Sequence, residues 1–147
     1  MFHVVDDNPV SGKNIVKIVN LFDEEAKFFT SAIAYLDYVK SDEYETPDAI
    51  FTDLFMYKMD GYELIEEVLA IHPEQKFVVV SGRPDLNHPN KYRACFYLTK
   101  PFYIRDIEKI IQEVRACAKD GPSAESDCAH RFKCPEFGLG EWKCPHA

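Results

Sequence analysis

Residues 76–82 read KFVVVSG, and this stretch is the clearest strand in the chain. A short run of apolar, β-branched residues that stops at a polar turn is typical of a strand covered on both faces of a sheet. Two other runs have the same form, FHVVD at 2–6 and DAIFTD at 48–53. Both of these runs end in an acidic residue, so we expect buried strands whose ends carry polar side chains.

Helical patterns alternate with these runs, and weaker strands are expected at 27–30 (KFFT) and 94–98 (ACFYL). The apolar residues at helical spacing are Ile15, Ile18, Val19 and Phe22; Ile33 and Leu36; Leu64, Ile65, Val68 and Leu69; and Ile104, Ile107, Ile110, Ile111 and Val114. Strands that alternate with helices predict an α/β fold, in which helices cover both faces of a doubly wound, five-stranded parallel sheet. We expect this domain to span residues 1–119 and a C-terminal extension to span residues 120–147.

The composition disfavours several classes of protein. The chain has 147 residues, of which 46% are hydrophobic, and this is enough to bury a core without disulfides. Its net charge of −8 disfavours direct contact with nucleic acid. The apolar runs are too short to cross a bilayer, and Asp6 and Asp7 interrupt the first of them, so we expect no membrane contact and a cytoplasmic location. Five cysteines, an odd number, argue against a disulfide framework.

Polar side chains stand at the ends of four predicted strands. Asp6 and Asp7 end the first strand, Asp53 the third, Ser81 the fourth, and Lys100 follows the fifth. The carboxyl ends of parallel strands open on one edge of a doubly wound sheet, where its ligands bind. Three clustered carboxylates repel one another unless a cation joins them, and Mg²⁺ prefers oxygen ligands. With Mg²⁺ or Mn²⁺ bound, one carboxylate could attack a phosphoryl group whose oxygens meet the lysine and the serine.

Five short motifs together resemble a known family, and they cover roughly residues 1–118. The motifs are VVDDNP (4–9), IFTD (50–53), MDGYEL (59–64), VVVSG (78–82) and YLTKPF (97–102). Their order and their place at strand ends make the chain similar to the response-regulator receiver family of two-component signalling, which includes the single-domain chemotaxis regulator. The resemblance implies a flavodoxin-like sheet with the strand order 2-1-3-4-5. Taken singly, each acid would be an ordinary solvated residue near a helix N-terminus.

The resemblance also implies how the acidic residues act. Asp53 matches the residue that accepts the phosphoryl group. Asp7 matches a direct ligand of the metal, and Asp6 matches its neighbour, which holds a metal-bound water. Phe55 would offer its backbone carbonyl to the metal.

Other matching residues imply a switch. Ser81 matches the hydroxyl residue that follows the phosphoryl group on activation, and Lys100 matches the lysine that pairs with the phosphate. Pro101 resembles a cis-proline position that helps to aim this lysine. Tyr97 matches an aromatic switch residue that turns inward when Ser81 moves, although it could also be a partly buried core tyrosine.

The sequence departs from the family between the fourth and fifth strands. The interval from Ser81 to Lys100 is about three residues shorter than is usual in the family, and it contains Pro84 and Pro89. Proline removes helical hydrogen bonds, so we expect the fourth helix to be short, distorted or absent. Tyr57 stands where the family usually has a proline.

The C-terminal extension is rich in residues that bind soft metals. Five of them lie within nineteen residues: Cys128, His130, Cys134, Cys144 and His146. Four such ligands could hold Zn²⁺, but the spacing matches no recognised zinc-finger pattern. The alternative is an extension with free thiols.

Three functions remain open from the sequence. The first is a stand-alone receiver that is not an enzyme in its own right; a histidine kinase or phosphotransfer protein phosphorylates it, and it signals by contact with a downstream protein or a second copy. The second is a degenerate receiver that acts as a scaffold, or as a metal or redox sensor through its extension. The third is a Mg²⁺-dependent aspartyl phosphohydrolase. Such enzymes place a second acid two residues after the nucleophile, where this chain has Phe55.

Overall fold

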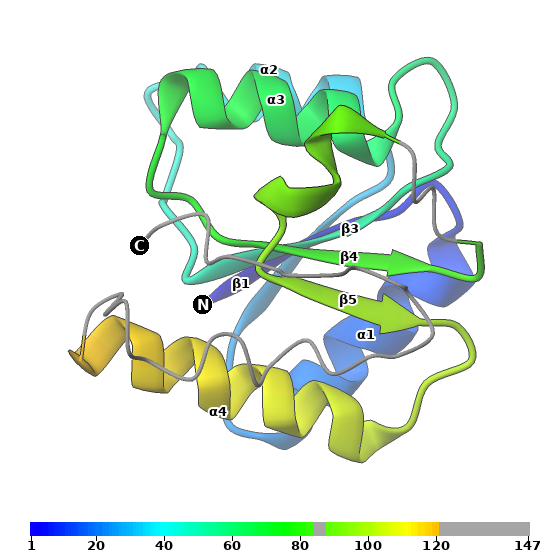
Figure 1. The fold of residues 1–147 in the computed structure, drawn as a ribbon, viewed down its shortest axis with the longest axis vertical. Helices are drawn as coiled ribbons and strands as arrows, with labels where there is room; N and C mark the ends of the chain where they lie inside the picture. The colour runs from blue at the N-terminus through cyan, green and yellow to red at the C-terminus, as the bar shows by residue number, and fades with distance from the viewer. Residues whose placement is uncertain (84–87, 121–147) are drawn as a thin grey trace.

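The computed structural model describes residues 1–83 and 88–120, which form one sheet with helices on both faces (Figure 1). The five strands are β1 (Phe2–Val5), β2 (Ala26–Phe29), β3 (Ala49–Asp53), β4 (Phe77–Ser81) and β5 (Phe96–Thr99). All are parallel, and their order is β2-β1-β3-β4-β5. The predicted doubly wound sheet and its strand order are therefore confirmed.

Three α-helices connect strands: α1 (Pro9–Leu21), α2 (Ala32–Val39) and α3 (Gly61–Ile71). A fourth, α4 (Ile104–Asp120), follows β5. Helices α2 and α3 lie together on one face of the sheet, and α1 and α4 lie on the other (Figure 1). Three of them begin at a side chain that accepts hydrogen bonds from the first turn: Asn8 for α1, Ser31 for α2 and Asp60 for α3. None of the described helices is both long and apolar enough to span a membrane.

The connection between β4 and β5 differs from the other crossovers, as the sequence predicted. Its described part contains a single 3₁₀ helix, η1 (Pro89–Arg93), in place of an α-helix. Helix α4 therefore follows β5 and is the last element of the described chain. It ends at Asp120, next to the expected boundary of the extension.

The core consists of strand side chains packed between the two helical layers. Phe2, Phe51 and Phe77 lie on three neighbouring strands and are fully buried. Strands buried on both faces account for the nearly continuous apolar runs in the sequence. The sheet is thus a rigid base on which the loops at its carboxyl edge are fixed.

Candidate functional site

Three carboxylates meet at the carboxyl edge of β1 and β3. These strands are direct neighbours, with Val5 opposite Thr52, so the residues that follow them come out side by side. One oxygen from each of Asp6, Asp7 and Asp53 lies within 4.8 Å of the other two. The sequence predicted this cluster from strand ends alone, and the structure brings all three residues together.

Backbone groups of the loop after β3 fix Asp53. The amide of Leu54 donates to Asp53 Oδ1 at 2.9 Å, and the amide of Gly61 donates to the Leu54 carbonyl at 2.8 Å. Gly61 packs so tightly that a Cβ there would overlap the Asp53 carbonyl oxygen and would lie 3.0 Å from Leu54 Cα. The first residue of α3 thus holds the end of β3 in place.

The other two acids are held by the loops on either side. Asp6 is 1% exposed, and its Oδ1 accepts a hydrogen bond from the Asn8 amide at 2.9 Å. Asp7 is exposed, and its Oδ2 accepts a hydrogen bond from the Tyr57 amide at 3.1 Å. Asp7 therefore links the loop after β1 to the loop after β3.

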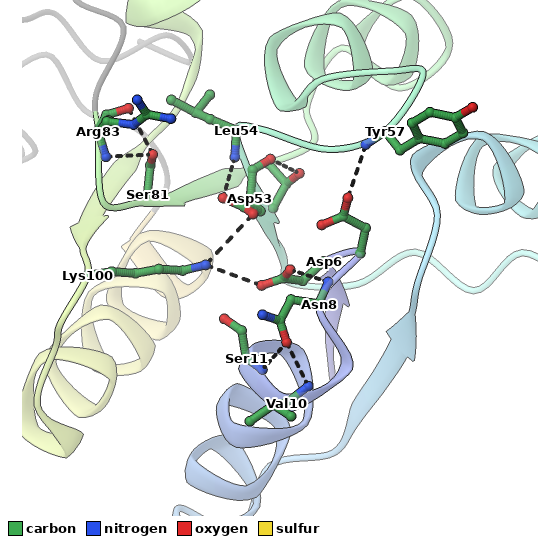
Figure 2. A network of polar contacts seen from close by, with 12 residues as sticks. Asp6, Asn8, Val10, Ser11, Asp53, Leu54, Tyr57, Ser81, Arg83 and Lys100 are labelled. Carbon is green, nitrogen blue, oxygen red and sulfur yellow. Dashed lines mark hydrogen bonds and ion pairs between the residues drawn. The ribbon is translucent and has the colours of Figure 1, made fainter.

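Lys100 places a cation between two of these carboxylates. Its Nζ lies 3.5 Å from Asp6 Oδ2 and 3.7 Å from Asp53 Oδ2 (Figure 2). The Lys100 amide donates to the Ser81 carbonyl at 3.0 Å, which ties this loop to the end of β4. The peptide bond between Lys100 and Pro101 is cis, as predicted.

The cluster makes ionisation of Asp53 unfavourable. Burial raises the pKa of Asp53 above its usual value; Lys100 opposes this shift, and the nearby Asp6 and Asp7 add to it. The three carboxylates lie close enough to bind one ion. A divalent cation that prefers oxygen ligands fits them, because its charge would offset their mutual repulsion. These residues could therefore hold Mg²⁺ or Mn²⁺.

Ser81 lies at the end of β4 and points into the turn that follows it. Its hydroxyl donates to the Arg83 carbonyl at 2.9 Å and accepts from the Arg83 amide at 3.1 Å (Figure 2). The Arg83 guanidinium lies 5.4 Å from the ring centroid of Phe55, whose side chain is about half exposed. Arg83 and Phe55 thus make a cation–π contact between the loop after β4 and the loop after β3.

Tyr97 points into the interior and not to the solvent. It is 8% exposed, and its hydroxyl lies 3.3 Å from the hydroxyl of Tyr62 in the first turn of α3. The sequence identified Tyr97 but not Tyr62. Tyr62 lies within the MDGYEL motif, but nothing in the sequence pattern predicts it as a partner of Tyr97. Only the packing of α3 against β5 reveals this partner.

Comparison with known proteins agrees with this geometry. The family model for the response regulator receiver domain matches residues 2–112. This chain belongs to that family. A curated relative, the response regulator receiver protein CpdR of Brucella abortus, is 32% identical over 75 residues, which are 47% of this chain and 60% of the relative. The uncharacterized transcriptional regulatory protein YesN of Bacillus subtilis is 35% identical over 79 residues, which are 49% of this chain and 22% of the relative.

Solved receiver structures share the fold. A CheY-like receiver domain from Methylobacillus flagellatus superposes with a TM-score of 0.68 at 27% identity, covering 77% of this chain and 96% of that one. A receiver domain from Clostridium thermocellum gives a TM-score of 0.72 at 24% identity, covering 80% and 95%. By contrast, the chain spans less than two thirds of the length of both curated relatives.

The structure does not describe the second set of predicted ligands in this receiver. Cys128, His130, Cys134, Cys144 and His146 all lie outside residues 1–83 and 88–120. The Zn²⁺ hypothesis for the extension therefore stays a prediction. The acidic cluster is the candidate metal site that the described residues provide.

Proposed function

We propose that this receiver accepts a phosphoryl group on Asp53 from the phosphohistidine of a histidine kinase or a phosphotransfer protein. The observation that carries the proposal is the meeting of Asp6, Asp7 and Asp53 within 4.8 Å, with the Lys100 ammonium beside two of them. This combination brings a nucleophile, oxygen ligands for a metal, and a fixed cation to one sheet edge.

We infer that Asp6, Asp7 and Asp53, with the backbone carbonyl of Phe55, would hold Mg²⁺ or Mn²⁺. When bound, the ion offsets the negative charge that the carboxylates and the incoming phosphoryl oxygens bring together. The donor set supports this assignment, since all of its atoms are hard oxygens. Burial is the main cause of the raised pKa of Asp53, and the negative charges of Asp6 and Asp7 add to it.

The transfer exchanges one bond to phosphorus for another. A carboxylate oxygen of Asp53 forms a bond to phosphorus, the bond from phosphorus to the histidine nitrogen breaks, and its electron pair returns to the imidazole. Leu54 N–H holds Asp53 Oδ1, and Lys100 Nζ stands beside Oδ2, so the nucleophile is oriented and a cation is ready for the phosphoryl oxygens. Ser81 would turn its hydroxyl from Arg83 toward the new phosphoryl group.

The output of this receiver is, in our proposal, contact with another protein or with a second copy. A net charge of −8 favours a protein partner over a nucleic acid. We propose a stand-alone role in the cytoplasm, with no catalysis beyond phosphorylation and dephosphorylation of the chain itself. An exposed Phe55 two residues after Asp53 supports this role over that of a phosphohydrolase with a second catalytic acid.

Intact mass measured after incubation with Mg²⁺ and a small acyl phosphate tests the proposal. The expected result is a gain of one phosphoryl group that disappears in Asp53→Asn and when Mg²⁺ is chelated. Asp37→Asn is the matched control, because Asp37 is an exposed acid on α2, away from the cluster. If the wild type gains no mass, beryllofluoride with Mg²⁺ separates a short-lived phosphoryl group from an inert site. Absence of mass gain, of Mg²⁺ binding and of beryllofluoride binding would contradict the proposal.

A further inference from the structure

Tyr62 makes a hydroxyl contact with Tyr97 inside the layer between α3 and β5. Both side chains are buried, at 3% and 8% exposed, and their oxygens lie 3.3 Å apart. This distance is at the long end for a hydrogen bond between hydroxyls, so its contribution falls at the lower end of the usual range. The contact joins residues that are 35 positions apart in the sequence.

Tyr62 also supports the connection between β4 and β5. Its ring stacks on the ring of His88, with the centroids 4.3 Å apart and the planes 10° from parallel. The side-chain amide of Asn90 donates to the Tyr62 carbonyl and to the Glu66 carboxylate, each at 3.3 Å. The backbone amide of Asn90 donates to His88 Nδ1 at 3.1 Å. Residues His88–Arg93, here called the η1 segment, thus dock on the first two turns of α3.

We propose that Tyr62 is a positioning residue that couples the inward position of Tyr97 to the docked η1 segment. This inference rests on the proposed function and on the switch role that the family resemblance implies for Tyr97. The hydroxyl of Tyr62 holds Tyr97 inward, and the ring and carbonyl of the same residue hold the η1 segment. One side chain therefore contacts both the switch and the 3₁₀ helix in the described part of the β4–β5 connection.

The coupling decides which surface changes when the receiver is phosphorylated. If phosphorylation favours the inward position of Tyr97, it also favours the contact between the Tyr97 and Tyr62 hydroxyls. Through the ring of Tyr62, it then favours the stack with His88. By linkage, a partner that binds the docked η1 segment favours inward Tyr97 and strengthens the phosphorylated state by the same factor. The output surface of this chain is then the η1 segment together with the start of α3.

Tyr62→Phe tests the coupling, because it removes the hydroxyl and keeps the ring that stacks on His88. Tyr103→Phe is the matched control, since Tyr103 is 67% exposed and also loses a phenolic hydroxyl. Fluorotyrosine placed at position 97 reports whether this ring is buried. The fluorine NMR chemical shift of an exposed ring changes between ordinary and deuterated water, whereas that of a buried ring does not. We expect Tyr62→Phe to increase the fraction of molecules in which the side chain at position 97 is exposed to solvent. Beryllofluoride binding should weaken about threefold, as for the loss of one weak hydrogen bond.

Hydrogen exchange of the η1 segment provides the second measurement. With Tyr97→Ala, which removes the inward ring, amides of the η1 segment should exchange several-fold faster, while amides of β1 and β3 should not change. A purely structural Tyr62 would lower stability without moving the fluorine signal of position 97. The proposal is overturned if Tyr62→Phe leaves that signal and the beryllofluoride affinity as they are in Tyr103→Phe, or if Tyr97→Ala leaves the η1 exchange unchanged.

The two proposals fail in different ways. If the wild type gains no phosphoryl group and binds neither Mg²⁺ nor beryllofluoride, the phosphoacceptor role of Asp53 is wrong. The fluorine signal and the exchange rates are measured without any phosphoryl analogue, so they still decide whether Tyr62 couples Tyr97 to the η1 segment.

Discussion

The two halves of the sheet depend on different kinds of contact. The acid half is formed by β1, β3 and the loops after them, and its reacting groups stand at the ends of these strands. Backbone amides close in the sequence hold two of the acids, Asn8 N–H for Asp6 and Leu54 N–H for Asp53. In the switch half, formed by β4, β5 and the η1 segment, the important contacts join distant residues, such as Tyr62 with Tyr97 and Asn90 with Glu66. The acid half is therefore set largely by where strands end, whereas the switch half is set by contacts across the fold.

This difference predicts which changes affect the phosphoryl chemistry and which affect the output. Asp53 depends on the register between β1 and β3 and on the close approach of Gly61. Neither feature involves the η1 segment. Changes in the switch half should therefore alter signalling and leave the metal site intact, while changes in the acid half should damage both.

The largest effect is expected for Gly61→Ala in the acid half. The new Cβ would overlap the Asp53 carbonyl oxygen, so β3 or α3 must shift. We expect the free energy of unfolding to fall by about 2–3 kcal/mol, as for other overpacked sites. Phosphorylation by a small donor should slow at least about tenfold, because a small displacement of a nucleophile is costly. Chemical unfolding and a mass-detected time course measure the two effects.

Gly82→Ala is the control in the switch half. A Cβ at Gly82 would lie 3.9 Å from Lys100 Cβ, which is an ordinary contact. Its unfolding free energy should stay within about 0.5 kcal/mol of the wild type. If both alanine variants lost phosphorylation equally, the close approach of Gly61 would not be the feature that holds Asp53 in place.

The sequence was sufficient for the acid half because that half is local. Asp6, Asp7 and Asp53 follow apolar runs, and adjacent parallel strands bring such ends together without any further information. The cis bond before Pro101 was also predictable from the resemblance. The prolines predicted the short 3₁₀ helix that stands in the described part of the β4–β5 connection.

The sequence was insufficient where contacts are made across the fold. Tyr62 has the pattern of an ordinary core residue, and its hydroxyl acquires a role only because α3 packs against β5. The hydroxyl of Ser81 is bonded to the Arg83 backbone, a turn geometry that strand periodicity does not encode. The stack of Tyr62 on His88 similarly depends on how a short connection folds back on α3.

The next largest effect concerns acid stability and His3 on β1. His3 is fully buried; burial lowers its pKa to about 4, with smaller contributions from Lys27 and the N-terminus. The unfolded chain takes up a proton near pH 6.5, while the folded chain does not, so stability is complete above pH 6.5 and falls as the pH drops toward 4. Between about pH 7 and pH 5 we expect a loss of about 2 kcal/mol from this residue.

Urea unfolding at these two pH values measures the loss, with His3→Phe as the comparison. The variant loses the hydrogen bond between His3 Nδ1 and the Tyr35 hydroxyl, so it starts from a lower stability. Its decline between pH 7 and pH 5 should nevertheless be smaller than that of the wild type by about 2 kcal/mol. Equal declines would mean that His3 is not the group that titrates.

A smaller effect is expected for Asn90→Ala in the switch half. The variant loses the hydrogen bonds from Asn90 to the Tyr62 carbonyl and to Glu66, and Asn90 is 8% exposed. We expect a loss of about 1–2 kcal/mol in the free energy of unfolding. Exchange should accelerate in the η1 segment, and Mg²⁺ affinity should not change. A parallel loss of Mg²⁺ affinity would show that the η1 segment also supports the acidic cluster when no phosphoryl group is bound.

The smallest effect is a gain of stability on removal of the proposed nucleophile. Burial raises the pKa of Asp53, so the folded chain keeps this proton to a higher pH than the unfolded chain does. The stability that the residue contributes is therefore present at low pH and is lost as the pH rises through the folded pKa. At neutral pH without divalent cation, Asp53→Asn should be slightly more stable than the wild type, and the difference in stability should close near pH 4.

The control is Ser81→Ala, at the corresponding strand end of the switch half, which should show no such pH-dependent difference from the wild type. Urea unfolding with a chelator measures both variants. A less stable Asp53→Asn at neutral pH would mean that the Lys100 ion pair outweighs burial, and that the site is already balanced without a metal.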